Sequence, residues 1–186
     1  AAGTSIQRAL GIEDSADAMY QYCMVLNQYR LQASLVRRFC EDSASGLEWL
    51  IKLGVEYRPE HLYVAGADGI ARGHRAAENG AAIIAALEQG ASSRGVTVAP
   101  RTRVRRLVTQ ERAVVGIIAD DEPLTAGAIV IATGGFGANR ELLTRYYPDA
   151  AIQDDLIYYV GGPNSRGDGL KMGLDVGAAL TGYNSG

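Results

Sequence analysis

The feature that most constrains the fold of this chain is a glycine break directly after an apolar run. Residues 128–132 read Ala-Ile-Val-Ile-Ala, and residues 133–137 read Thr-Gly-Gly-Phe-Gly. An apolar run without alternation is typical of a central strand of a parallel sheet that is covered on both faces. A helical pattern follows from about Asn139 to Tyr146. We therefore expect a strand, turn and helix of an α/β layer, with a turn whose backbone a flat or phosphorylated ligand could approach. The alternative is a tight turn without a ligand.

A second glycine pair is found where the last helix is expected to begin. Gly167-Asp168-Gly169 precedes a helical pattern, and the free amides of a helix start attract anions such as a diphosphate. The alternative is that Asp168 only caps the helix. Neither this pair nor Gly135-Phe136-Gly137 continues as G-x-G-x-x-G, so the phosphate loop of a complete dinucleotide fold is not found in these residues.

The remaining pattern divides the chain into a mainly helical segment, 1–72, and a mixed segment, 73–186. Helices are expected from Asp14 or Ser15 to about Leu26 and from near Leu31 to Gly54, after which Pro59 predicts irregular chain. The mixed segment predicts a helix over 79–94, a short strand over 96–98 and a hairpin of 104–109 with 114–119, with a third strand near 125–126. The fold class is α/β, and α+β in part, with parallel-sheet strands and a small antiparallel meander.

The composition of the chain argues against several other classes of protein. The 186 residues are 47% hydrophobic with a net charge of -3, which suits one sizeable core and argues against a nucleic-acid partner. The arginines at 101, 103, 105 and 106 are then expected to be mostly a solvated strand face. No apolar run reaches the roughly 20 residues of a membrane span. Two cysteines supply neither a disulfide framework nor a zinc site, so we expect a cytoplasmic protein without a metal.

Several short motifs together resemble one flavoprotein family. They are 71–75 (ARGHR), the helix end at 94–95, 96–98 (VTV), 102–107 (TRVRRL), 129–136 (IVIATGGF) and 167–170 (GDGL). Their order resembles that of the fumarate reductases and succinate dehydrogenases, including the 3-ketosteroid dehydrogenase branch. Residues 3–9, 39–43 and 49–50 are similar to the ketosteroid-like or uncharacterised reductase-like members. The resemblance extends over almost the whole chain.

The resemblance implies FAD as cofactor and assigns residues to it. The residue matching Val104 meets the adenine through its backbone. The segment matching Ala132, Thr133, Gly134 and Gly135 lies along the adenosine and diphosphate, and Gly167 and Asp168 lie near the same cofactor. His74 lies in a segment close to the active-site side, where a structural hydrogen bond is the favoured role. No position matches a catalytic residue of the family.

The resemblance also implies a partial Rossmann-like FAD-binding domain over 1–186. The family's amino-terminal strand with its G-x-G-x-x-G loop and its cap domain are expected outside these residues. The whole protein is expected to reduce or form an activated carbon–carbon double bond, on a dicarboxylate, a steroid or another enone, while these residues alone bind FAD weakly or not at all. An unpaired strand edge at 129–131 would favour self-association. The alternative is a noncatalytic α/β module that binds a nucleotide or a protein.

Overall fold

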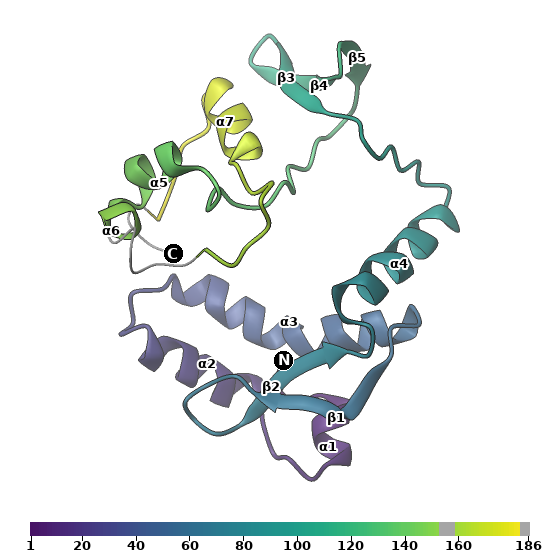
Figure 1. Ribbon diagram of the computed structural model, residues 1–186, viewed down its shortest axis with the longest axis vertical. Coiled ribbons are helices and arrows are strands. Elements are labelled where there is room, and N and C mark those ends of the chain that lie inside the picture. Colours follow the sequence, from purple (N-terminus) through teal and green to yellow (C-terminus); the bar gives the residue numbers. More distant parts are fainter. Residues whose placement is uncertain (153–158, 183–186) are drawn as a thin grey trace. The chain divides into compact units, whose positions relative to one another are not determined.

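The computed structural model describes residues 1–152 and 159–182. It contains two compact units, Ala1–Val98 and Ala99–Gly186, and each is described by itself. Helices and strands are mixed in both units (Figure 1). In the described residues no helix has the length and apolarity to span a bilayer.

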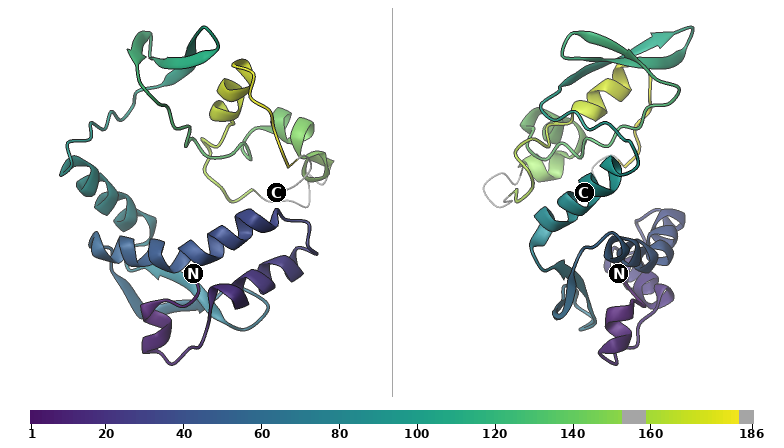
Figure 2. Two further views of the ribbon diagram at one scale, coloured as in Figure 1. Left: turned by 180° about the vertical axis from the view of Figure 1, so that it is seen from behind. Right: turned by 90° about the vertical axis from the view of Figure 1, so that its right-hand side faces the viewer.

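Four helices build most of the first unit: α1 (Ser5–Ala9), α2 (Ala16–Leu26), α3 (Ala33–Lys52) and α4 (Asn79–Ser92). The predicted cap of α2 is confirmed, because the Ser15 side chain accepts a hydrogen bond from the Ala18 amide. The start of α1 carries a capping box, in which Thr4 and Gln7 bind each other's backbone amides. Helices α2 and α3 lie side by side (Figures 1 and 2).

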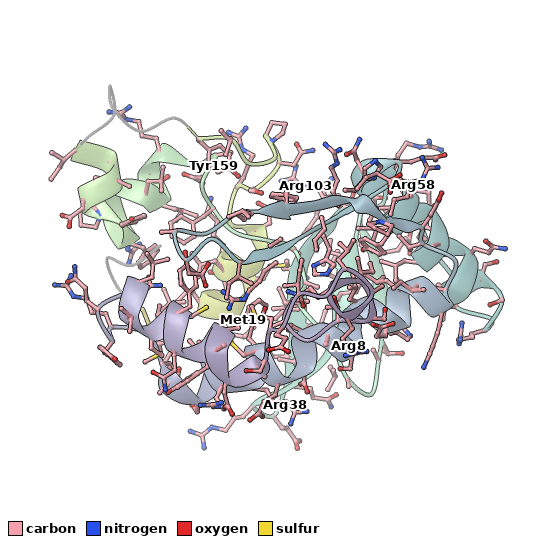
Figure 3. The ribbon with its side chains drawn as sticks, turned by 90° about the horizontal axis from the view of Figure 1, so that it is seen from below. Arg8, Met19, Arg38, Arg58, Arg103 and Tyr159 are labelled. Atoms are coloured by element: carbon pink, nitrogen blue, oxygen red, sulfur yellow. The ribbon has the colours of Figure 1, made fainter. Side chains whose placement is uncertain are left out.

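The core of the first unit lies between α2, α3 and the start of the chain. Ala2, Met19 and Cys40 are buried together, and Tyr20, Cys23 and Val36 are among the partly buried residues packed against them. Figure 3 shows Met19 on α2, while Arg38 on α3 projects into solvent, where 75% of its side chain is exposed. The two helices thus present apolar side chains to each other and charged ones outward.

A hairpin completes the first unit and corrects one prediction. β1 (Tyr57–Val64) pairs antiparallel with β2 (Ala71–Ala76), so the chain after Gly54 is not irregular. Pro59 lies in β1, where the pairing register shifts between Tyr57 and Leu62. A register irregularity tolerates a residue that lacks an amide hydrogen, which explains how the strand accommodates proline.

The second unit begins with the predicted meander. β3 (Val104–Gln110), β4 (Ala113–Ala119) and β5 (Glu122–Thr125) form an antiparallel sheet in that order. The turn residues Glu111 and Arg112 both have positive φ, 48° and 71°, as a two-residue type I′ turn requires. Helix α5 (Arg140–Tyr146) follows, capped by Asn139, and then α6 (Pro148–Ile152) and α7 (Asp168–Asp175).

The predicted parallel strands are not formed. Among the described residues both sheets are antiparallel, and neither 96–98 nor 128–132 belongs to a strand. Val130 is 88% exposed. A parallel strand obtains its hydrogen bonds and its cover only from neighbouring elements, and none of the described strands pairs with this run. The prediction of a strand over 128–132 is therefore wrong for the described structure.

Candidate cofactor-binding site

The two glycine turns singled out in the sequence meet in the second unit. The Gly167 amide donates a hydrogen bond to the Gly135 carbonyl oxygen at 3.1 Å. The Gly169 amide donates to Thr133 Oγ1, also at 3.1 Å. Residues 133–135 and 167–169 are therefore packed directly against each other, although they are far apart along the chain.

Gly167 and Gly169 make this close approach possible. A Cβ on Gly169 would lie 2.2 Å from Thr133 Oγ1 and 2.4 Å from Ile131 Cγ2. A Cβ on Gly167 would lie 2.3 Å from Leu142 Cδ1, and its φ of 80° is a left-handed conformation. Both glycines are buried. Their role in the described structure is to allow two backbone segments to pack together.

Gly134 and Gly135 instead present backbone to the outside. Both are exposed, and Gly134 has a φ of 74°. Among the described residues, a Cβ on Gly135 would have no neighbour within 4 Å, and one on Gly134 would have only Ser165 Oγ, at 3.8 Å. The space beside this turn is open to a ligand. These residues fit a flat or phosphorylated group, because no described side chain lies against Gly135 to hold such a group away from the backbone.

The structure at the start of α7 corrects the expectation of free amides there. The amides of Gly167 and Gly169 were predicted to be free for an anion, but both are bound to the other glycine turn. Asp168 also places a carboxylate in the first turn of α7, where it complements the helix dipole. A diphosphate would find little attraction at these two amides, so the open face of Gly134 and Gly135 is the better candidate for that part of the ligand.

Val104 and Asp168, two further residues predicted to contact the cofactor, both line a cavity of about 370 Å³. It lies between β3 and α7, and its lining residues are Arg103, Val104, Arg105, Asp168, Lys171, Met172 and Asp175. Arg103 Nη2 lies 3.8 Å from Asp168 Oδ2 (Figure 3 labels Arg103). The arginine side chains are largely exposed, 70% for Arg103 and 51% for Arg105, as expected of a solvated strand face. Backbone groups of a strand beside a carboxylate suit a neutral ligand that forms hydrogen bonds.

His74 lies in the first unit, and both of its ring nitrogens have partners. Nδ1 lies 2.9 Å from the Arg72 carbonyl oxygen, and Nε2 lies 3.0 Å from Thr4 Oγ1. Because a carbonyl only accepts, Nδ1 carries the hydrogen and Nε2 accepts from the threonine hydroxyl. Burial lowers the pKa of His74, which keeps the ring neutral. The hydrogen bonds are those of the structural role favoured for this residue.

An ion pair that the sequence did not predict lies next to His74. Arg72 binds Asp14 with two hydrogen bonds, Nε to Oδ2 at 2.7 Å and Nη2 to Oδ1 at 2.8 Å, and its third nitrogen binds Asp68. The Asp14 side chain is fully buried and that of Arg72 is 10% exposed. Burial by itself raises the pKa of Asp14, but hydrogen bonds from Arg72 and Gln7 outweigh it and leave the pKa lowered. The hydrogen bond with Asp14 raises the pKa of Arg72. Because 58 positions separate the partners, no local pattern indicates the pair.

Comparison with known proteins identifies the family. The model of a family described as "FAD binding domain" matches residues 1–184. The chain belongs to this FAD-binding family. It is 29% identical over 193 residues to a probable fumarate reductase of Shewanella frigidimarina, covering 97% of this chain and 31% of that protein. It is 30% identical over 183 residues to a urocanate reductase of Eggerthella lenta, covering 94% and 30%.

Solved structures agree with this family. The open conformation of a flavocytochrome c3 fumarate reductase superimposes with a TM-score of 0.81 at 28% identity, over 95% of this chain and 32% of that chain. A 3-ketosteroid Δ4-(5α)-dehydrogenase of Rhodococcus jostii shares the fold, with a TM-score of 0.77 at 23% identity over 96% and 44%. The resemblance stated from the motifs is confirmed. The chain spans about a third of the length of the two curated relatives.

Proposed function

We propose that this chain forms the adenosine and diphosphate side of the FAD site of a flavin-dependent oxidoreductase that acts on an activated carbon–carbon double bond. Membership of the FAD-binding family supports FAD as the cofactor. The reaction class is inferred from the names of two relatives, a probable fumarate reductase and a urocanate reductase. A dicarboxylate, a steroid or another enone remains the proposed range of substrates. When bound, FAD supplies the hydride exchange with the substrate carbon.

The observation that carries the proposal is the open face of Gly134 and Gly135. It is fixed by two hydrogen bonds to the start of α7, so its shape is set before any ligand arrives. A turn held in this way loses little conformational freedom when it binds. In the proposed site these glycines lie along the diphosphate, with Ala132 and Thr133 continuing the same wall.

The adenosine is assigned to the cavity between β3 and α7. The Val104 backbone faces the adenine there, and the Asp168 carboxylate accepts a hydrogen bond from a ribose hydroxyl, with Gly167 behind it. The competing hypothesis, a noncatalytic nucleotide- or protein-binding module, has less support because the two curated relatives compared above are reductases.

The test is a comparison of cofactor affinities in the full-length protein. FAD and FMN share the flavin, but FMN lacks the adenosine half. Asp168→Asn should weaken FAD binding and leave FMN binding unchanged, and ADP should compete with FAD for the apoprotein. Glu122→Gln is the matched control, because Glu122 lies in the same unit, is exposed and does not line the cavity. Equal weakening of FAD and FMN in Asp168→Asn would show that this residue does not serve the adenosine side.

A further inference from the structure

The first unit contains a mostly apolar cavity of about 300 Å³. Its walls come mainly from α2, from β2 and from the loop that joins β1 to β2. The apolar side chains include those of Met19, Leu26 and Ile70, and Tyr22 adds an aromatic ring. A cavity of this size and character is typical of a site for a small organic molecule.

Hydrogen bonds hold the β1–β2 loop in position against α2 and β2. The Ala67 amide donates to Tyr22 Oη at 2.9 Å, and Arg72 Nη1 donates to Asp68 Oδ2. Because these contacts are made within the protein, this wall of the cavity is preformed. A ligand therefore does not have to order the loop when it binds, which reduces the conformational entropy lost on binding.

The charged groups of the cavity favour an uncharged ligand. Asp68 and Arg72 are the ionic side chains that line it, and they form an ion pair with each other. The Arg72 side chain is only 10% exposed, and Asp14 takes two more of its N–H groups, so it offers little to a carboxylate or a phosphate. The Ala1 amino group donates to the Arg72 carbonyl oxygen at 3.0 Å, and burial lowers its pKa, which disfavours its charged form. A charged ligand would lose its hydration without gaining a free counter-ion.

Asp68 retains acceptor capacity for one polar group of such a ligand. Its side chain is 23% exposed, Oδ2 accepts from Arg72, and Oδ1 accepts from the Ile70 amide at 3.3 Å. A carboxylate has about four lone-pair sites, so its oxygens can accept a further hydrogen bond. A hydroxyl group is an uncharged donor that forms a short, charge-assisted hydrogen bond with a carboxylate.

We propose that this cavity binds a neutral aromatic alcohol, with its ring against Tyr22 and the apolar walls and its hydroxyl group donating to Asp68. The volume sets the size of the ligand, because a cavity of about 150 Å³ holds one benzene ring and this cavity is about twice as large. Two fused rings with one hydroxyl group match this volume. The inference does not rest on the proposed function, because the lining residues belong neither to the glycine turns nor to the cavity beside α7.

Equilibrium dialysis of the full-length protein against three bicyclic probes tests the proposal. The probes are 2-naphthol, 2-methoxynaphthalene, which has no hydrogen to donate, and 2-naphthoate, which is charged. FAD is present in excess, so that a probe does not occupy the proposed cofactor site. 2-Naphthol should bind saturably, 2-methoxynaphthalene about tenfold more weakly, and 2-naphthoate not measurably. Equal binding of 2-naphthol and 2-naphthoate, or no saturable binding of 2-naphthol, would overturn the proposal.

Variants of the β1–β2 loop locate the bound probe. Ala65→Leu enlarges a residue of the cavity wall and should abolish 2-naphthol binding. Ala67→Leu is the matched control, because it makes the same change in the same loop at an exposed residue that does not line the cavity. Asp68→Asn should weaken 2-naphthol binding about tenfold and leave 2-methoxynaphthalene binding unchanged. Thermal unfolding checks that each variant is folded, and unchanged 2-naphthol binding in folded Ala65→Leu would refute the proposal, because the probe would then bind elsewhere.

Discussion

Replacing Gly135 by alanine tests the cofactor site most directly, because the change adds one methyl group at a position where the chain itself has room. A Cβ at Gly135 has no neighbour within 4 Å, and Gly135 does not require a left-handed backbone. The variant should therefore fold with unchanged stability. If the diphosphate of FAD lies against this turn, the methyl group occupies space that the ligand needs.

The magnitude follows from the cost of overfilling a packed contact. One added methyl group in a close contact costs about 1–3 kcal/mol. If the added methyl group raises the free energy of the FAD complex and not that of the free protein, FAD affinity decreases roughly 5- to 150-fold. Flavin fluorescence titration of the apoprotein measures the change, and thermal unfolding of the apoprotein checks that the fold is intact.

The matched control is Gly127→Ala, which makes the same chemical change in the same unit. A Cβ there also has no neighbour within 4 Å, and the residue is exposed. Gly127 lies outside both glycine turns, so the control should bind FAD as the parent does. Unchanged FAD affinity in Gly135→Ala would refute the placement of the diphosphate on this turn.

Three further predictions concern stability. Gly169→Ala should lower the free energy of unfolding by about 1–3 kcal/mol, because its Cβ would lie 2.2 Å from Thr133 Oγ1; urea denaturation measures this, and a neutral result would contradict the packing role. Asp14→Asn should cost about 1–3 kcal/mol, because buried Arg72 loses one of its two carboxylate partners and keeps only Asp68. A loss well below about 1 kcal/mol in thermal unfolding would argue against the ion pair. Burial lowers the pKa of His74, so as the pH falls below about 6.5 the unfolded chain takes up a proton before the folded chain does, and the free energy of unfolding should decrease toward acid. His74→Gln should make this decrease of stability with falling pH less steep. An equally steep decrease in the variant would exclude His74 as its origin.

Much of the fold could be predicted from the sequence because its signals are local. Ser15 and Asn139 bind amides three residues ahead, so the starts of α2 and α5 are encoded within one turn of helix. The β3–β4 hairpin is encoded in the same way by its two-residue turn. The prediction of irregular chain at Pro59 was wrong because it considered the proline alone. The shifted pairing register between β1 and β2 is what makes proline tolerable there, and it depends on the partner strand.

The candidate site likewise combines features that the local sequence encodes with features that depend on the tertiary structure. The sequence by itself determined that two glycine turns exist, one after an apolar run and one at a helix start, because glycine patterns are local. Only the tertiary structure decided that the turns bind each other, with 36 positions between Thr133 and Gly169, and that the amides of Gly167 and Gly169 are thereby occupied. It also decided that, within residues 1–152 and 159–182, the Gly135 side remains open and no strand pairs with the apolar run before it. The physical reason is that a hydrogen bond between distant segments depends on how the chain closes, which no local pattern of residues encodes.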